Sequence, residues 1–151
     1  MATADIVVTP RIDPRYAAFE LEVRPSRIHR WGVFAEEPIP ARRKVIEYTG
    51  ERISRRETKR RSERRHVYLF ELDAYWCLDG ATGGSGAELI NHCCEPNLSS
   101  MILRGHILYV SRRVISPGEE LTVDYFLSTD MGAVRCRCGA PGCRGVINRM
   151  R

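Results

Sequence analysis

The sequence predicts a mostly β fold with irregular connections, one short helix and a C-terminal tail that a metal ion organises. Many short stretches place apolar residues alternately or in brief runs between turn residues, which is typical of strands. Only one stretch carries the signals of a helix start. The chain after Ser128 is polar and glycine-rich, yet it carries three cysteines. We therefore expect a metal to order it.

Length and composition fit a single domain of ordinary size. With 151 residues the chain is long enough to bury one core without disulfides. Apolar residues make up 43% of it, and no apolar run approaches the roughly 20 residues of a membrane span. Residues 1–14 lack the basic head and apolar block of a secretory signal. Six cysteines without export features favour reduced thiols and metal binding.

Three strands are expected in the first third of the chain. Residues 19–23 read Phe-Glu-Leu-Glu-Val, an alternation typical of a strand with one face in water. After a loop with proline and glycine, residues 33–35 resume as a short strand. Residues 44–48 form the third, which Thr49-Gly50 closes.

The one expected helix begins after Ser54. Ser54 with Glu57 at the third helical position is a capping box, in which each side chain bonds the other residue's backbone amide. We expect the helix to continue to about Arg65.

The second half of the chain alternates strands with tight turns. Strands are expected at residues 68–72, 75–78, 101–103, 106–110 and 120–123. Asp73-Ala74 joins the first two, and Arg104-Gly105 turns the hairpin between the third and fourth. Residues 87–90 are expected to form a short helical turn.

The net charge of +5 comes almost wholly from arginine, since Lys44 and Lys59 are the only lysines. Much of this charge is bunched between Arg52 and Arg65. A basic surface favours a polyanion such as nucleic acid. A solvated helix with charge pairs at i,i+4 explains the same pattern, and the residues alone leave both interpretations open.

Three cysteines near the C-terminus indicate a zinc site. Cys136, Cys138 and Cys143 have the spacing C-x-C-x4-C, with glycines that permit tight turns around a metal. A tetrahedral site needs a fourth ligand. The candidates elsewhere in the chain are Cys77, Cys93, Cys94, His92 and His106. The residues alone do not choose among them, although the apolar surroundings of Cys77 favour a buried structural role.

Residues 88–97, Glu-Leu-Ile-Asn-His-Cys-Cys-Glu-Pro-Asn, combine a polar Asn91-His92 pair with a cysteine pair. Taken singly, Asn91-His92 is explained by a hydrogen-bonded buried pair, and Tyr125 by a half-buried strand end. Their joint order with the other motifs indicates a function. That order is an aromatic-glycine loop, Tyr-Thr-Gly-Glu, Tyr-Leu-Phe, Asn-His-x-Cys-x-Pro-Asn, Gly-Glu-Glu-Leu-Thr-x-Asp-Tyr and Cys-x-Cys-x4-Cys.

This order of motifs resembles the SET-domain family of protein lysine methyltransferases over nearly the whole chain. Residues 29–34 look like the family's first cofactor loop, and residues 47–51 look like its second block. Residues 91–97 and 118–125 look like the two segments that cross as a pseudoknot beside the active site. Residues 136–145 look like a post-SET segment.

The resemblance implies a SET-domain β-clip fold of small curved sheets around the pseudoknot, with the predicted helix in a variable insert. It implies an N-terminal extension at residues 1–16, a SET domain at residues 17–128 and a post-SET zinc segment at residues 129–151. No cysteine-rich pre-SET segment precedes Phe19 in the sequence.

The resemblance also implies the fourth zinc ligand. In family members with a post-SET segment, the cysteine of Asn-His-x-Cys joins the three C-terminal ones, which makes Cys94 the partner of Cys136, Cys138 and Cys143. Four thiolates form a closed structural site. One structural zinc ion would then fold the tail over the active site without entering the reaction.

The implied activity is methyl transfer from S-adenosylmethionine to a lysine amine. This reaction needs a neutral amine aligned with the carbon–sulfur bond, so orientation and exclusion of water are the tasks of the protein. Tyr125 falls on the family's catalytic tyrosine, and Tyr48 on a tyrosine that lines the lysine channel. The cofactor-binding positions are matched by His29, Arg30, Trp31, Tyr68, Asn91, His92 and Arg137, with Arg30 and Arg137 expected to contribute through their backbone.

Two positions depart from the family pattern. Cys93 stands where serine is common, which exchanges one small residue for another. Val123 stands where family members often carry Phe or Tyr, at a site that helps to set how many methyl groups are added. Valine leaves more room there, so we expect multiple methylation.

The resemblance favours a histone tail as the lysine-bearing protein or peptide substrate. The basic stretch between Arg52 and Arg65 is a candidate contact for nucleosomal DNA. We expect a monomer with no membrane association and no secretion. Its expected location is nuclear chromatin in a eukaryote or the cytoplasm in a bacterium.

Two functions of other classes are the alternatives. The first is a catalytically idle SET-fold zinc module that binds chromatin or another protein, against which Tyr125, Asn91 and His92 speak. The second is a nucleic-acid-binding zinc protein, which rests on charge alone. Calorimetry separates them, because cofactor binding without transfer favours the first and no cofactor binding favours the second.

Overall fold

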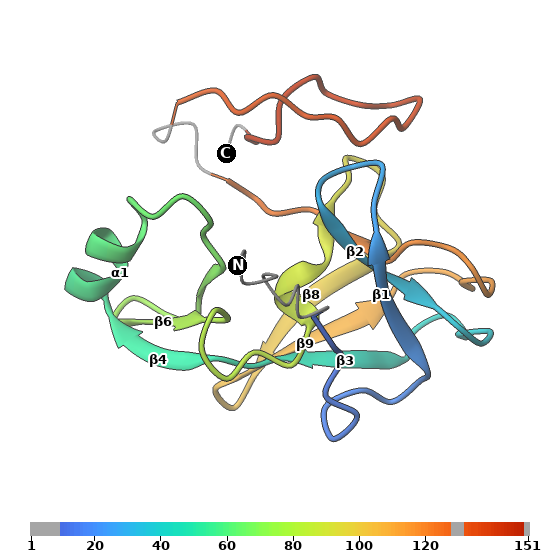
Figure 1. The fold of residues 1–151 in the computed structure, drawn as a ribbon, viewed down its shortest axis with the longest axis horizontal. Coiled ribbons are helices and arrows are strands. Elements are labelled where there is room, and N and C mark those ends of the chain that lie inside the picture. Colours follow the sequence, from blue (N-terminus) through green and yellow to red (C-terminus); the bar gives the residue numbers. More distant parts are fainter. Residues whose placement is uncertain (1–9, 128–131, 150–151) are drawn as a thin grey trace, which may run out of the picture.

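The computed structural model describes residues 10–127 and 132–149 (Figure 1). It is a mostly β structure, as the sequence predicts. The strands are β1 (Leu21–Pro25), β2 (Trp31–Ala35), β3 (Lys44–Tyr48), β4 (Glu51–Ser54), β5 (Leu69–Glu71), β6 (Trp76–Asp79), β7 (Asn91–His92), β8 (Leu98–Leu103), β9 (His106–Ser111) and β10 (Thr122–Val123). The helices are α1 (Arg55–Arg61) and the short 3-10 turn η1 (Ala87–Leu89).

The strands form small separate sheets. β1 pairs with β2, and two three-stranded antiparallel sheets have the orders β3-β9-β8 and β4-β6-β5. The turn between β8 and β9 has positive φ at both central residues, 50° at Arg104 and 81° at Gly105. This is the conformation that favours a tight hairpin, so the predicted turn at Arg104-Gly105 is confirmed.

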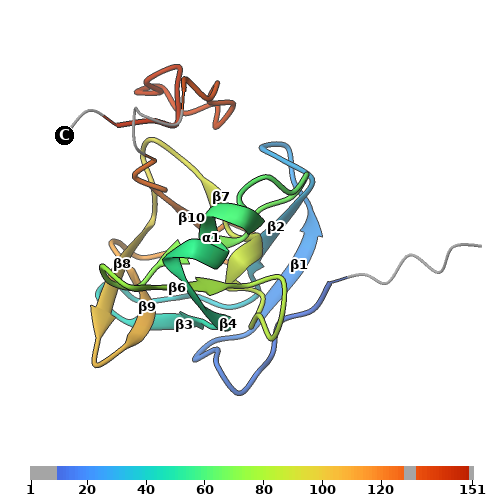
Figure 2. The ribbon, with the colours of Figure 1, turned by 90° about the vertical axis from the view of Figure 1, so that its left-hand side faces the viewer.

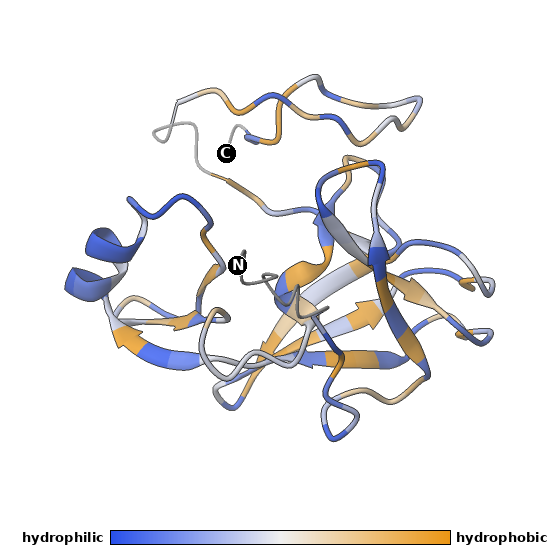
Figure 3. Ribbon diagram, viewed as in Figure 1, coloured by the Kyte–Doolittle hydropathy of each residue, from blue (hydrophilic) through white to orange (hydrophobic). Residues whose placement is uncertain are grey.

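The core is apolar and lies between these sheets. Its largest fully buried apolar side chains are Ile39, Ile46, Ile90, Leu98, Ile107, Ile115, Leu121, Val33, Val45 and Val123. Each contributes about 1.5–3 kcal/mol by leaving water. Figure 3 shows the apolar residues concentrated on the central strands, whereas α1 is hydrophilic throughout. Helix α1 buries no residue and is therefore attached by polar contacts.

Helix α1 begins as predicted but ends earlier. The hydroxyl of Ser54 accepts a hydrogen bond from the Glu57 amide at 3.3 Å. The reciprocal half of the capping box does not form, because the Glu57 carboxylate accepts from Arg60 and Arg61 instead. The helix ends at Arg61 rather than at the predicted Arg65. The Ser62 hydroxyl donates to the Lys59 carbonyl at 2.6 Å, a local bond that competes with a further helical turn.

Several strand predictions need correction: β8 begins at Leu98 rather than at residue 101, and β7 was not predicted. The first strand is Leu21–Pro25 rather than residues 19–23, because Pro25 pairs with Trp31 and extends the hairpin with β2. Strand β4 was not predicted at all. Only Ile53 of its residues is buried, so the sequence there carries no alternating apolar signal, and pairing with β6 creates the strand.

Two segments far apart in the sequence lie side by side at the centre of the molecule (Figure 2). β7 pairs in parallel with β10, with Asn91 opposite Thr122 and His92 opposite Val123. The Asn97 side chain fixes this arrangement, since its amide nitrogen donates to the Glu120 carbonyl at 2.9 Å. The residue after β10 is thereby brought next to β7.

The ends of the chain are described only in part. The predicted N-terminal extension begins outside the described residues, which start at residue 10, and the predicted boundary near residue 128 also lies outside them. Asp13 donates its amide to the Ser85 carbonyl at 2.8 Å, which ties the described part of the extension to the core. No helix in the described ranges has the length and apolarity needed to cross a membrane.

Candidate active site and metal centre

Tyr125 is bound at both its backbone and its hydroxyl to the segment around β7. Its amide donates to Nδ1 of His92 at 3.1 Å, and its hydroxyl donates to the Ile90 carbonyl at 2.6 Å. Its ring meets the His92 ring edge to face, with centroids 5.4 Å apart. The structure therefore brings Tyr125 against the Asn91-His92 pair.

The Tyr125 phenol stays protonated at neutral pH. The residue is 44% exposed, but its hydroxyl is enclosed. Burial raises its pKa, and the nearby Tyr68 and Glu120 raise it further. The group is thus suited to orient a reactant by hydrogen bonding, and is not a phenolate base.

His92 lies between Tyr125 and a cysteine. Burial lowers the pKa of His92 although Asp124 acts in the opposite direction, so the ring is neutral at pH 7. Because Nδ1 accepts from the Tyr125 amide, the ring proton is on Nε2. That nitrogen lies 3.5 Å from the sulfur of Cys94.

Asn91 attaches the loop before β2 to the centre of the molecule. Its side-chain nitrogen lies 2.8 Å from the Trp31 carbonyl, 3.2 Å from the His29 carbonyl and 2.9 Å from a Glu120 carboxylate oxygen. On the same loop, Arg30 has a φ of 39°, and its guanidinium lies 3.5 Å from the Tyr68 hydroxyl. The predicted cofactor residues of the loop therefore meet Asn91 and Tyr68.

An aromatic wall surrounds Tyr48. Its hydroxyl donates to the Tyr68 carbonyl, and its ring lies 5.2 Å from Phe70 and 6.2 Å from Tyr109 between centroids. Burial raises the pKa of Tyr48 well above its usual value, so this hydroxyl also stays neutral. The wall is largely apolar, and a hydrogen bond fixes the Tyr48 hydroxyl, which suits the aliphatic stem of a long side chain.

Four cysteine sulfurs converge where the C-terminal segment meets the core. The sulfurs of Cys94, Cys136, Cys138 and Cys143 all lie within 4.8 Å of one another. The sulfur of Cys94 is 3.7 Å from that of Cys136 and 4.0 Å from that of Cys143. Tetrahedral zinc with Zn–S bonds of about 2.3 Å separates its sulfurs by about 3.8 Å, so the arrangement fits this metal.

One thiol of the cluster ionises readily, whereas burial raises the pKa of Cys94 and Cys136, so these two thiols would lose their protons on metal binding. Burial raises the pKa of Cys138, but hydrogen bonds from the amides of Cys94 and Ala140 and from the neighbouring thiols lower it to about 6. Metal binding requires thiolates. Of the other sequence candidates for the fourth ligand, Cys77 is buried in β6 and His106 pairs with Glu47. Cys94 is the candidate that the structure brings to the cluster.

A family model described as SET domain matches residues 30–126. The chain belongs to the SET-domain family. Among curated relatives, it is 39% identical over 137 residues to the "Histone-lysine N-methyltransferase, H3 lysine-4 specific" of Candida albicans, covering 82% of this chain and 13% of the relative. It is 38% identical over 134 residues to the human "Histone-lysine N-methyltransferase SETD1A", covering 82% of this chain and 8% of the relative.

A solved structure shares the SET-domain fold. It is described as the "crystal structure of KRYPTONITE in complex with mCHG DNA and SAH" and matches with a TM-score of 0.76 and 32% sequence identity, covering 89% of this chain and 30% of that one. The chain thus spans about an eighth of the Candida albicans relative and less than a third of the solved chain.

The SET-domain site contains residues that sequence reasoning missed. Phe70 and Tyr109 complete the wall around Tyr48, and Asp124 pairs with the C-terminal segment. No signal for Tyr109 existed in the sequence, because Leu108 and Val110 beside it in β9 are apolar as well and the alternate burial of this strand is seen only in the structure. By contrast, one predicted cofactor residue, Arg137, is not brought to the others. It is exposed, and within the described ranges it makes no hydrogen bond or ion pair with the other predicted cofactor residues.

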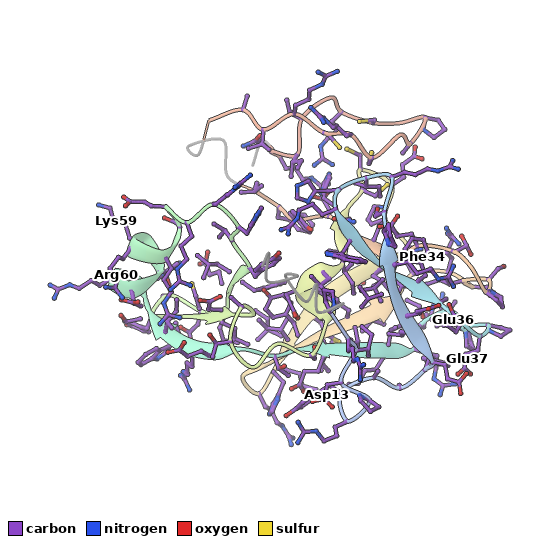
Figure 4. All side chains as sticks on the ribbon, viewed as in Figure 1. Asp13, Phe34, Glu36, Glu37, Lys59 and Arg60 are labelled. Carbon is purple, nitrogen blue, oxygen red and sulfur yellow. The ribbon has the colours of Figure 1, made fainter. Side chains whose placement is uncertain are left out.

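Half of the basic residues between Arg52 and Arg65 are paired with acids in the structure. Glu57 forms ion pairs with Arg60 at i,i+3 and with Arg61 at i,i+4. Arg61 also forms an ion pair with the buried Asp79, at 2.8 Å. Figure 4 shows Lys59 and Arg60 pointing outward at one end of the molecule and Glu36 and Glu37 at the other. The solvated helix with charge pairs is therefore present, and arginine pairing anchors it to the core.

Proposed function

We propose that this chain is an S-adenosylmethionine-dependent protein lysine N-methyltransferase that acts on a histone H3 tail. The observation that carries the proposal is the attachment of Tyr125, through its hydroxyl and its amide, to the corner formed by Ile90 and His92. This corner adjoins the loop that Asn91 holds through its bonds to His29 and Trp31. Membership of the SET-domain family supports the same activity.

The residues of the site match the needs of methyl transfer. S-adenosylmethionine, when bound, supplies an electrophilic methyl group on a sulfonium sulfur. A lysine must present its neutral amine in line with the methyl–sulfur bond and lose a proton to solvent. The rings of Tyr48, Phe70 and Tyr109 enclose the aliphatic stem and exclude water. The Tyr125 hydroxyl orients the amine, since this phenol is neutral and fixed at its backbone.

The cofactor would lie against the loop at residues 29–31, Tyr68 and the Asn91-His92 pair. The side-chain nitrogen of Asn91 is already engaged by the loop carbonyls, so we assign Asn91 the task of holding the loop while its backbone faces the cofactor. His29, Arg30 and Trp31 supply the loop surface, and Arg137 contributes through its backbone. The solved relative is described in complex with SAH, which is the product that S-adenosylmethionine leaves after transfer.

The four thiolates would hold one structural zinc ion. Its site is closed, because all four positions are filled by Cys94, Cys136, Cys138 and Cys143. The metal would connect the C-terminal segment to the end of β7 and would take no part in the transfer. Its effect on activity would come from placing residues 132–149 over the site.

The substrate assignment comes from the relatives. The relatives in Candida albicans and Saccharomyces cerevisiae are named as specific for lysine-4 of histone H3. In a eukaryotic host the protein would then act on chromatin in the nucleus. Contact with nucleosomal DNA would fall to the outward residues of α1 and would weaken with salt.

The test is incubation of the zinc-loaded protein with labelled S-adenosylmethionine and histone H3 peptides, followed by mass spectrometry of the modified lysine. We expect label on the peptide that contains lysine-4 and none on a peptide with arginine in its place. The matched control is Tyr75→Phe, which removes a hydroxyl from a residue that is 75% exposed and should leave the rate unchanged. Binding of the cofactor without transfer to any histone or peptide would contradict the proposal and favour an idle module.

A further inference from the structure

A buried carboxylate joins the C-terminal segment to the strand end that carries Tyr125. The side chain of Asp124 is 7% exposed, and Arg144 pairs with it through both guanidinium nitrogens, at 3.0 and 3.3 Å. Two parallel bonds to one carboxylate make this the strong form of an ion pair. Asp124 belongs to the core, whereas Arg144 belongs to the segment at residues 132–149.

A second arginine of the segment reaches the same carboxylate. Arg149 lies 3.4 Å from Asp124, and its guanidinium is 5.0 Å from the centre of the Phe126 ring. Its amide donates to the Leu127 carbonyl at 3.0 Å. The end of the segment is therefore attached to the residues just after Tyr125 by contacts that involve no cysteine.

The junction has little apolar packing to hold it. A cavity of about 400 Å³ opens beside the ion pair, with Val123, Asp124, Arg144 and Arg149 among the residues that line it. The buried apolar cluster of the described residues contains no member from residues 132–149. Polar contacts and the cysteine cluster therefore account for the attachment of the segment.

The ion pair connects the residue before Tyr125 to the residue after the last cysteine of the metal cluster. Arg144 follows Cys143, and its amide donates to the sulfur of Cys94 at 3.4 Å. Asp124 precedes Tyr125. Burial raises the pKa of Asp124, but the hydrogen bonds from Arg144 and from the Phe126 amide hold it below its usual value. Removal of Arg144 would leave this buried charge poorly compensated.

We propose that the Asp124–Arg144 pair is a second fastening of the C-terminal segment, independent of the metal, and that Arg144 acts through it as a positioning residue for Tyr125. Arg149 is the weaker companion, because it is more exposed and makes a single contact with the carboxylate. The role of Tyr125 in this statement rests on the proposed function. The attachment of the C-terminal segment by the ion pair does not depend on the proposed function.

The first test measures hydrogen exchange in residues 132–149 of the zinc-loaded protein. Arg144→Ala should speed exchange there about tenfold, since a partly buried ion pair is lost. Arg144→Lys should restore part of the protection, because lysine keeps the charge but not the two-point contact. Arg149→Ala should have an effect of less than about threefold. Arg113→Ala is the matched control, since Arg113 pairs with Glu119 on the core surface and should leave exchange in the segment unchanged.

A double-mutant comparison tests the pair directly. If the pair is the fastening, Arg144→Ala should add little to the exchange already caused by Asp124→Asn. Additive effects, or equal exchange in Arg144→Ala and Arg113→Ala, would overturn the proposal. Should Arg144→Ala fail to fold, Arg144→Lys and Arg149→Ala give the same comparison in milder form.

Kinetics separate a positioning role from a merely structural one. Arg144→Ala should raise KM for S-adenosylmethionine and lower kcat, with partial recovery of both in Arg144→Lys, at unchanged zinc content. If the wild-type protein transfers no methyl group, the proposed function fails while the exchange measurements still decide the fastening. If it does transfer, and Arg144→Ala has the same KM and kcat as Arg113→Ala, the positioning role of Arg144 fails, and the exchange measurements decide the fastening.

Discussion

The core and the C-terminal segment are held by different forces. The core buries a continuous set of isoleucine, leucine and valine side chains between its small sheets. The segment at residues 132–149 lies above it in Figure 1, and its buried residues in the described range are Cys136 and Asn148. Its own backbone closes only a short loop, with Arg135 opposite Val146. Four sulfurs and the Asp124 ion pairs attach it.

The difference explains how one small protein can combine a rigid active site with a covering segment that opens while the core stays folded. Apolar burial makes the core cooperative, so the core stays folded when the segment opens, and the Asp124–Arg144 pair then adjusts the position of Tyr125. A segment held by a few polar and metal contacts opens at a lower free energy than the core unfolds. Entry and release of a cofactor need such a part, and the proposed activity places the segment over the site.

Loss of one metal ligand should have the largest effect, and the structural change should be confined to the C-terminal segment. Cys143→Ser leaves three thiolates, so zinc content should fall well below one equivalent and methyl transfer should drop at least about 100-fold. Hydrogen exchange should rise most in residues 132–143 and less in residues 144–149, which keep the Asp124 pairs. The midpoint of thermal unfolding of the core should change little.

The matched variant for the core is Cys77→Ala, which alters a buried cysteine of β6 outside the metal cluster. It should keep one equivalent of zinc and lower the stability of the core by about 1 kcal/mol. Together the two variants test whether the regions are separable. A Cys143→Ser protein with a full equivalent of tightly bound zinc would remove that residue from the ligand set.

Removal of the Tyr125 hydroxyl should affect turnover within an intact core. Tyr125→Phe deletes the donor to the Ile90 carbonyl but keeps the ring and the amide bond to His92. We expect turnover to fall about 100-fold, the usual cost of one oriented hydroxyl in an active site, with cofactor affinity within about threefold of wild type. Single-turnover kinetics and calorimetry measure the two quantities. Equal turnover in Tyr125→Phe and Tyr75→Phe would mean that the tyrosine is wrongly assigned.

The core was more accessible to sequence reasoning than the segment's attachment. Strand β3 and the turn at Arg104-Gly105 follow from a short run of strand-forming residues and from turn residues, which act within a few positions. Strand β4 was missed because a single apolar residue, Ile53, marks it. Helix α1 was predicted too long, since a local bond of Ser62 ends it where helix propensity alone would continue.

The candidate site was predictable where motifs carry it and not where distant residues meet. Tyr125 and Asn91-His92 stood out through the order of motifs along the chain. The partnership of Asp124 with Arg144 did not, although each lies in a recognised motif, because the two residues meet only when residues 118–125 and the post-SET segment are folded together. Tyr109 was missed for the same reason, as its wall is built from three separate strands.

Acid should release the two attachments of the segment in separate steps. Zinc leaves as the thiolates are protonated, which comes first on acidification because a thiol has an ordinary pKa of about 8.5 and a carboxyl one of about 3.9. The folded pKa of Asp124 is lowered, so its contribution is fully present above the unfolded value of about 3.9 and is lost only as pH falls through the folded value. NMR signals of the Arg144 guanidinium should therefore move below about pH 4, after zinc release. Asp124→Asn should abolish this later step, and one combined transition would contradict the separation.

The smallest expected effect concerns Val123, a core residue at the boundary with the C-terminal segment. This side chain is 2% exposed in β10 and lines the cavity of about 400 Å³ at the junction. Val123→Phe introduces the aromatic residue that family members often carry at this position, so the product should shift several-fold towards monomethyl-lysine, with an overpacking cost of about 1–3 kcal/mol. Val123→Ile adds a single carbon and should still give multiply methylated product. Mass spectra showing only monomethyl-lysine from the wild-type protein would contradict the role assigned to valine, because the space beside the amine would then be too small without any added ring.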